Sequence, residues 1–155
     1  QARQELVQTL GENVSLRRAA TLSGAPGTIV SYIHTNGTVG TLLEIKEGSD
    51  SINLDMAMHI TAMSPLVVSA DQLPASVVDK EREILLERAR SAEDRKPDNI
   101  IERMVGGQLK KFESESCLLS QGFVRDPKVS VSKVLKDAKA EVLKFVRYQV
   151  GEATS

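Results

Sequence analysis

The segment SYIHTNGTVGTLLEI, residues 31–45, constrains the fold of this chain more than any other part of its sequence. Its Asn36-Gly37 dipeptide favours a two-residue type I′ turn, and alternating residues flank the dipeptide on both sides. The segment therefore predicts a β-hairpin. The cross-strand pairs expected for this turn are Thr35 with Thr38, His34 with Val39, Tyr32 with Thr41, and Val30 with Leu43.

One face of the predicted hairpin is mostly apolar, because successive side chains of a strand point to opposite sides of a sheet. We expect a helix to cover this face and His34 to lie partly buried at its rim. The other residues of this face are Val30, Tyr32, Val39, Leu43 and Ile45. The opposite face mixes Ile29, Ile33 and Leu42 with Ser31, Gly40 and Glu44.

The residues around the hairpin predict a helix, a strand and a second helix. An amphipathic pattern covers residues 1–10 and ends at a glycine. Alternating residues in the range 14–22 indicate a strand, which the segment SGAPG ends. The second helix is expected to start at a cap formed by Asp50 or Ser51 and to stop before Pro65. Its apolar stripe consists of Ile52, Met56, His59, Ile60 and Met63.

Two long amphipathic helices are predicted next, interrupted by the segment EDRKP. Apolar residues recur about every seven positions in the range 77–92, and a second stripe covers the range 100–112. Such helices with a short connector pack as an antiparallel hairpin. Gly106-Gly107 lies inside the second helix, where we expect another backbone to approach closely.

The C-terminal part of the chain predicts a short helix and a last strand. ESCLLSQGFVRDPKVS is interpreted as a loop with an extended piece, after which Ser130 caps the helix and residues 142–150 form the strand. Together the elements predict an α+β fold, with small antiparallel sheets flanked by helices and a protruding helical hairpin. We divide the chain into an N-terminal core part (1–72), the helical hairpin (73–116) and a C-terminal part that completes the core (117–155).

Charge and composition disfavour several classes of function. The chain carries 20 Lys and Arg against 21 Asp and Glu, so it has no net basic field for the phosphates of a nucleic acid. Aromatic residues make up 3% and Trp is absent, which disfavours base stacking. No apolar run reaches the length of a membrane span. The single cysteine, Cys117, excludes an internal disulfide framework and favours a reducing compartment.

Motifs for cofactor binding are absent from the sequence. The nucleotide-binding patterns Gly-x-x-x-x-Gly-Lys-Ser/Thr and Gly-x-Gly-x-x-Gly do not occur, and no residues have the spacing of zinc ligands. His59 is expected to be a core histidine that a backbone group satisfies, in preference to a metal ligand shared with His34. A nucleophilic triad of His34, Cys117 and an Asp is the enzymatic alternative. From the residues alone, the chain is best interpreted as an α+β binding module with no catalytic residue, metal or cofactor.

Five segments of the chain, in this order, resemble translation elongation factor Ts. They are GENVSLRRAATLSG, IVSYIHTNGTVGTLLEI, MAMHITAMSP, KPDNIIERMVGGQLKKF and VLKFVRYQVGE, and they extend over nearly the whole chain, residues 5–152. RRAATLSG and YIHTNGTVGTLLEI are the most specific of these.

This resemblance implies a guanine-nucleotide exchange factor, which binds the GTPase elongation factor Tu and accelerates release of GDP. It also implies the dimerisation-domain type of α+β fold with a projecting helical hairpin. A full-length factor carries an N-terminal helical module and a Thr-Asp-Phe-Val motif, and we expect this sequence, which contains neither, to be a fragment. The alternative is a module that binds elongation factor Tu or the ribosome without promoting exchange by itself.

The resemblance further implies which residues contact elongation factor Tu. His34 is either such a contact or a satisfied structural histidine, and Phe123 is either an exposed anchor or a core residue. The helical hairpin is an arm toward the partner or toward a second copy in a homodimer. The setting is cytoplasmic or organellar, in a chloroplast stroma or mitochondrial matrix. The implied contacts are Leu10, Gly11, His34, Phe123, Val124 and Arg125.

Overall fold

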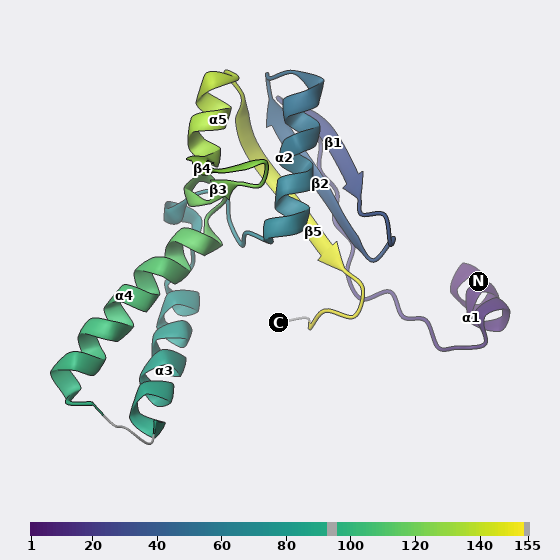
Figure 1. Ribbon diagram of the computed structural model, residues 1–155. Coiled ribbons are helices and arrows are strands. Elements are labelled where there is room, and N and C mark those ends of the chain that lie inside the picture. Colours follow the sequence, from purple (N-terminus) through teal and green to yellow (C-terminus); the bar gives the residue numbers. More distant parts are fainter. Residues whose placement is uncertain (93–95, 154–155) are drawn as a thin grey trace.

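A three-stranded antiparallel sheet carries the main core in the computed structural model, which describes residues 1–92 and 96–153 (Figure 1). Its strands are β1 (Thr28–Ile33), β2 (Val39–Lys46) and β5 (Glu141–Gln149), in the order β1-β2-β5. A second sheet pairs the short strands β3 (Gly122–Phe123) and β4 (Asp126–Ser130). The predicted α+β class with small antiparallel sheets is confirmed.

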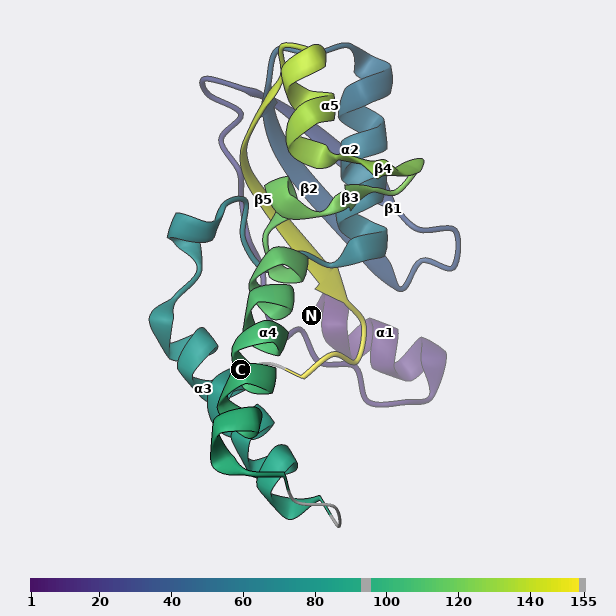
Figure 2. The same cartoon turned by 60° about the vertical axis from the view of Figure 1, so that its left-hand side comes forward.

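Helices cover one face of the three-stranded sheet, whereas the extended segment 12–27 crosses the other face (Figures 1 and 2). α2 and α5 belong to the covering layer, together with β3 and β4. α3 and α4 leave this body as a projecting arm, and α1 lies apart from it at the hairpin end. The helices are α1 (Ala2–Leu10), α2 (Asp50–Met63), α3 (Ala75–Ser91), α4 (Asp98–Ser116) and α5 (Val131–Asp137), with 3₁₀ turns at Ala70–Gln72 and Leu118–Ser120.

The predicted hairpin and its register are confirmed by the pairing of β1 with β2. Tyr32 lies opposite Thr41, Val30 lies opposite Leu43, and the N–H of His34 donates to the carbonyl of Val39 at 2.9 Å. As expected, a helix covers the apolar face. The residues buried between the sheet and α2 include Leu43, Ile45, Met56, Ala57 and Ile60, all fully excluded from solvent.

The type I′ turn predicted for Asn36-Gly37 is wrong. Only Gly37 has a positive φ, at 69°, and its N–H donates to the carbonyl of His34, so the loop between the strands is longer than two residues. The side-chain oxygen of Asn36 accepts hydrogen bonds from the N–H and the hydroxyl of Thr38 at 3.1 and 2.9 Å. This local bonding by the Asn36 side chain stabilises an alternative turn, and it leaves His34 exposed beyond the end of β1.

The strand predicted for residues 14–22 is also wrong. The segment is extended but pairs with no strand in the described part of the chain, and Leu16 is 85% exposed. Alternation indicates a strand only where a partner strand supplies the hydrogen bonds of the ladder. Here side chains hold the segment instead, because Arg18 lies over the ring of Tyr148 at 4.5 Å and pairs with Glu152.

The second predicted helix is confirmed as α2, although its cap lies one residue earlier than expected. Ser49 has the extended backbone that a cap requires, and its hydroxyl accepts from the N–H of Ile52 at 3.4 Å. Asp50 is already helical. Met56, His59 and Ile60 of the predicted stripe are buried, whereas Met63 is half exposed at the end of the helix.

The arm consists of α3 and α4, which pack around Leu85, Ile101 and Val105 as the predicted helical hairpin. The segment EDRKP lies partly outside the described residues, since 93–95 are not among them. The close backbone approach expected at Gly106-Gly107 is not found, because a Cβ at either position would meet no atom within 4 Å. α4 also continues through Ser116, into the stretch that we expected to be a loop.

The C-terminal elements agree with the sequence pattern. Ser130 caps α5, its hydroxyl accepting from the N–H of Lys133 at 3.2 Å. β5 follows directly and pairs with β2 along its whole length, with an irregularity between Glu44 and Ile45. The last strand therefore joins the sheet that the hairpin began, across about a hundred intervening residues, consistent with one shared core.

Ile60→Ala is expected to lower the free energy of unfolding by about 2–5 kcal/mol, because Ile60 is fully buried between α2 and the sheet and its truncation leaves a cavity. Leu54→Ala on the same helix is the matched control, and it should cost less than about 1 kcal/mol, since Leu54 is exposed. Urea denaturation measures both values. Equal losses in the two variants would contradict the placement of α2.

Candidate partner-binding surface

The first group of candidate residues lies at the hairpin end of the molecule. Leu10 is 57% exposed at the end of α1, and Gly11 stops this helix in a left-handed conformation, its N–H donating to the carbonyl of Val7. His34 is exposed, and its Nδ1 lies 3.4 Å from the hydroxyl of Tyr32. The hairpin loop points toward the α1 end in both views, so the structure places these residues at one end (Figures 1 and 2).

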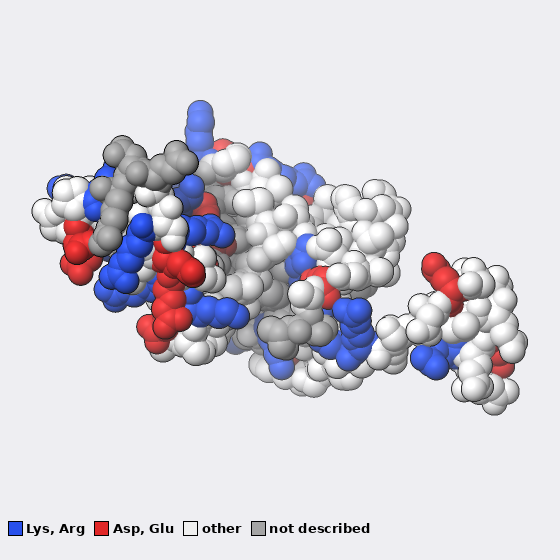
Figure 3. All heavy atoms as spheres, turned by 90° about the horizontal axis from the view of Figure 1, so that it is seen from below, with Lys and Arg blue, Asp and Glu red and all other residues white. Residues whose placement is uncertain are grey.

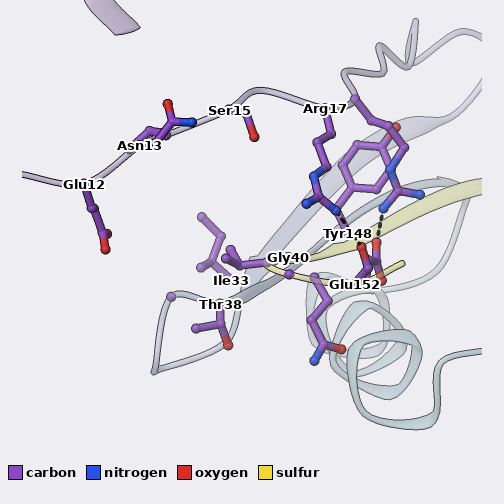
Figure 4. A pocket seen from close by; sticks show the side chains of 15 residues that line it. Glu12, Asn13, Ser15, Arg17, Ile33, Thr38, Gly40, Tyr148 and Glu152 are labelled. Atoms are coloured by element: carbon purple, nitrogen blue, oxygen red, sulfur yellow. Dashed lines mark hydrogen bonds and ion pairs between the residues drawn. The ribbon is translucent and has the colours of Figure 1, made fainter. Parts of the chain in front are cut away.

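A cleft of about 530 Å³ separates the N-terminal segment from the hairpin (Figure 4). Its walls come from the extended segment 12–18, from the hairpin loop and from the end of β5. Two of its apolar side chains, Ile33 and Val150, are 70% and 75% exposed. Both side chains line the same cleft, which makes this end of the molecule a candidate contact surface.

Glu152 fastens the N-terminal segment to the sheet beside this cleft (Figure 4). Its carboxylate pairs with Arg18 and lies 3.7 Å from Arg147, and its backbone carbonyl accepts from Arg17 at 3.4 Å. A backbone hydrogen bond at Gln149 lowers the pKa of Glu152, and Arg18 and Arg147 lower it further. Sequence reasoning missed this cluster, since no spacing in the sequence links positions 17 and 18 to position 152.

The second group of candidate residues forms the turn between β3 and β4, on the other side of α2 from the hairpin loop (Figure 1). Val124 is 39% exposed, and the guanidinium of Arg125 reaches back to the carboxylate of Asp55 on α2 at 2.5 Å. Phe123 is buried, with its ring stacked on His59 at a centroid distance of 5.8 Å. Of the two alternatives for Phe123, the structure therefore shows the core residue.

His59 is buried and fully hydrogen-bonded, which confirms the expected core histidine. Its Nδ1 accepts from the N–H of Val124 at 3.1 Å, and its Nε2 lies 2.9 Å from the side-chain oxygen of Gln121. Because a backbone N–H can only donate, Nδ1 carries no proton and Nε2 is the donor to Gln121. Burial lowers the pKa of His59, and the hydrogen bond to Gln121 opposes this effect without overcoming it.

The enzymatic alternative receives no geometric support from Cys117. Its thiol is buried, and burial raises its pKa, with Glu113 and Asp71 adding to the effect. A nucleophilic cysteine needs the opposite, an accessible thiol with a lowered pKa. Among residues 1–92 and 96–153, no three His, Cys, Asp or Glu side chains are placed to share a metal ion.

The charges visible from below are mixed in sign and gather on the arm, whereas the α1 segment is mostly uncharged (Figure 3). In the described part of the chain, no helix combines the length and the apolar character that crossing a bilayer would require. The fold is thus an α+β core with a projecting helical arm, and two separated groups of exposed candidate residues lie on its surface.

Comparison with known proteins identifies the family. The family model described as Elongation factor TS matches residues 1–152. Elongation factor Ts of Alcanivorax borkumensis is 47% identical over 98% of this chain and 52% of its own length. The Legionella pneumophila (strain Lens) and Halorhodospira halophila proteins of the same name are each 45% identical, over 98% and 97% of this chain and 51% and 50% of their own lengths.

The chain belongs to the elongation factor Ts family, a family of translation elongation factors in protein biosynthesis. The resemblance inferred from the five sequence segments is thereby confirmed. The chain spans about half the length of the curated relatives it matches.

The stability of this protein is expected to fall as the pH falls below about 6.5, the ordinary pKa of histidine. The pKa of His59 is lower in the folded chain than in the unfolded chain, so the unfolded chain takes up a proton first as the pH falls. The contribution of neutral His59 to the free energy of unfolding is therefore complete above pH 6.5 and is lost as the pH falls toward the folded pKa. Thermal melting between pH 7.5 and 5 measures the slope.

His59→Gln should remove this part of the pH dependence, whereas His34→Gln, which leaves His59 in place, should keep it. An unchanged slope in His59→Gln would show that other groups cause the loss of stability.

Proposed function

We propose that the chain binds the GTPase elongation factor Tu and promotes the release of GDP during protein synthesis. Membership of the elongation factor Ts family over residues 1–152 is the observation that carries this proposal. The relatives named above are bacterial proteins, which favours a cytoplasmic setting over an organellar one.

Nucleotide exchange of this kind needs surface contacts and no bond chemistry. A protein that binds the nucleotide-free GTPase more tightly than the GDP-bound form must weaken GDP binding by the same coupling free energy. Such couplings typically amount to about 1–3 kcal/mol, which changes an affinity by about 5- to 150-fold. We therefore assign no catalytic residue, metal or cofactor to this chain and describe it as a factor that acts by differential binding.

The proposed contacts are the exposed members of the two groups described above. Leu10, Gly11 and His34 form the contact at the hairpin end, beside the cleft with Ile33. Val124 and Arg125 form the second contact, where an apolar side chain and a partly exposed guanidinium lie next to each other. Phe123, being buried, supports this second contact from within the core.

The alternative function is binding without exchange. In this alternative, the chain is a module that docks on elongation factor Tu or on the ribosome and does not promote exchange by itself. The projecting arm of α3 and α4 is then a further surface, toward the partner or toward a second copy of the chain.

Release of a fluorescent GDP analogue from elongation factor Tu separates the two functions. We expect the chain to accelerate this release and to compete with GDP at equilibrium, because the coupling is reciprocal. Binding without acceleration would favour the docking module. A chain that binds neither nucleotide-free nor GDP-bound elongation factor Tu would rule out both functions.

His34→Ala is expected to weaken binding to elongation factor Tu by about tenfold, equivalent to about 1.4 kcal/mol. The melting temperature should change little, since His34 is exposed and lies outside β1. Ser31→Ala, on the opposite face of β1 and also exposed, is the matched control and should bind like the wild type. A large loss of melting temperature in His34→Ala would instead assign this histidine a structural role.

A further inference from the structure

We propose that His59 and Gln121 are positioning residues, which hold the turn containing Val124 and Arg125 in the shape that binds the partner. This inference rests on the proposed function, since it concerns the second contact described there. Neither side chain reaches the surface, because His59 is fully buried and Gln121 is 6% exposed. They act on the contact through hydrogen bonds to the backbone.

The first link is the hydrogen bond between the N–H of Val124 and Nδ1 of His59, at 3.1 Å. It holds the backbone of the proposed contact residue itself. The second link is the hydrogen bond from Nε2 of His59 to the side-chain oxygen of Gln121, at 2.9 Å. This bond sets the orientation and the tautomer of the imidazole, so that Nδ1 is free to accept from the turn.

The third link anchors Gln121 to the ends of two helices. Its side-chain nitrogen donates to the carbonyl of Glu115 in α4 and, at 3.5 Å, to the carbonyl of Met63 at the end of α2. These donor contacts show that the amide oxygen of Gln121 faces His59. The network is therefore directional: each donor has an acceptor, and reversing either side chain would leave buried polar atoms unpaired.

A second tether holds the other end of the same turn. Arg125 pairs with Asp55, which lies one helical turn before His59 on α2. Val124 and the residue after it are therefore both held by side chains of the same helix, α2. The position of α2 dictates where this side chain lies.

The turn is not packed on every side. An open surface hollow of about 560 Å³ lies beside it, lined among others by Met63, Val124 and Pro127. The hydrogen bond to His59 and the ion pair with Asp55 are therefore the polar contacts that fix the turn to α2. Without the bond to His59, the turn would lose its preorganised shape, and ordering it again on binding would reduce the affinity.

Two substitutions of His59 separate positioning from stability. In His59→Asn, the side-chain oxygen takes the place of Nδ1 and can still accept from Val124. In His59→Gln, the longer amide reaches the place of Nε2 and can still bond to Gln121, but the N–H of Val124 loses its acceptor. Both variants remove the imidazole and its stacking on Phe123, so both should be less stable than the wild type.

We expect His59→Gln to bind elongation factor Tu about tenfold more weakly than the wild type, whereas His59→Asn stays within about threefold. Val124→Ala should weaken binding in the wild-type background and add little in the His59→Gln background, because the turn is already displaced there. Affinities are measured on the full chain with nucleotide-free elongation factor Tu, at a temperature where melting curves show both variants folded.

Hydrogen exchange of the Val124 amide gives a readout without the partner. It should be slow in the wild type and in His59→Asn, and fast in His59→Gln. A fast-exchanging Val124 amide in the wild type would overturn the inference whether or not the variants fold.

Equal affinities in the two variants, or fully additive effects of Val124→Ala, would overturn the inference and leave the proposed function intact. A wild-type chain that does not bind elongation factor Tu at all would overturn the proposed function, and the inference with it.

Discussion

The burial of the apolar face of the β1–β2 hairpin by α2 is the interaction on which the rest of the structure depends. Leu43 and Ile45 meet Met56 and Ile60 in a layer that excludes water completely. Each fully buried aliphatic side chain of this size contributes about 1.5–3 kcal/mol relative to an exposed one. β5 joins the same sheet from the far end of the chain, so the core closes only when both halves are in place.

α2 is buried on more than the side that faces the sheet, because Phe123 of β3 and the turn that follows it contact His59 and Asp55. Asp55 and His59 reach the β3–β4 turn, whereas Thr61 bonds to Thr41 of β2 at 2.8 Å and accepts, through its carbonyl, from Arg147 of β5 at 3.1 Å. One helix thus sets the relative position of the sheet and of the turn. A surface that acts by fit requires this kind of rigid support.

Several features of the fold were predictable from local patterns. The alternation around Asn36-Gly37 predicted the strands and their register, because one buried face specifies which residues pair. The Ser130 cap and the glycine after α1 were predictable because a capping hydroxyl and a left-handed glycine act on residues of the adjoining helix turn. The turn type was not, since the Asn36 side chain offers its backbone a competing set of hydrogen bonds. The strand predicted for residues 14–22 was wrong because alternation shows that a segment could form a strand, but not whether a partner strand lies beside it.

The sequence by itself determined the α+β class, the hairpin register, the helical arm and the family, since periodicity, caps and characteristic segments are written in neighbouring residues. Only the tertiary structure decided the burial of Phe123, the attachment of Glu152 to the arginines of the N-terminal segment, and the chain of hydrogen bonds from Gln121 through His59 to Val124. These contacts join residues up to 135 positions apart. Their free energy depends on distance, burial and donor direction in space, none of which the order of residues along the chain specifies locally.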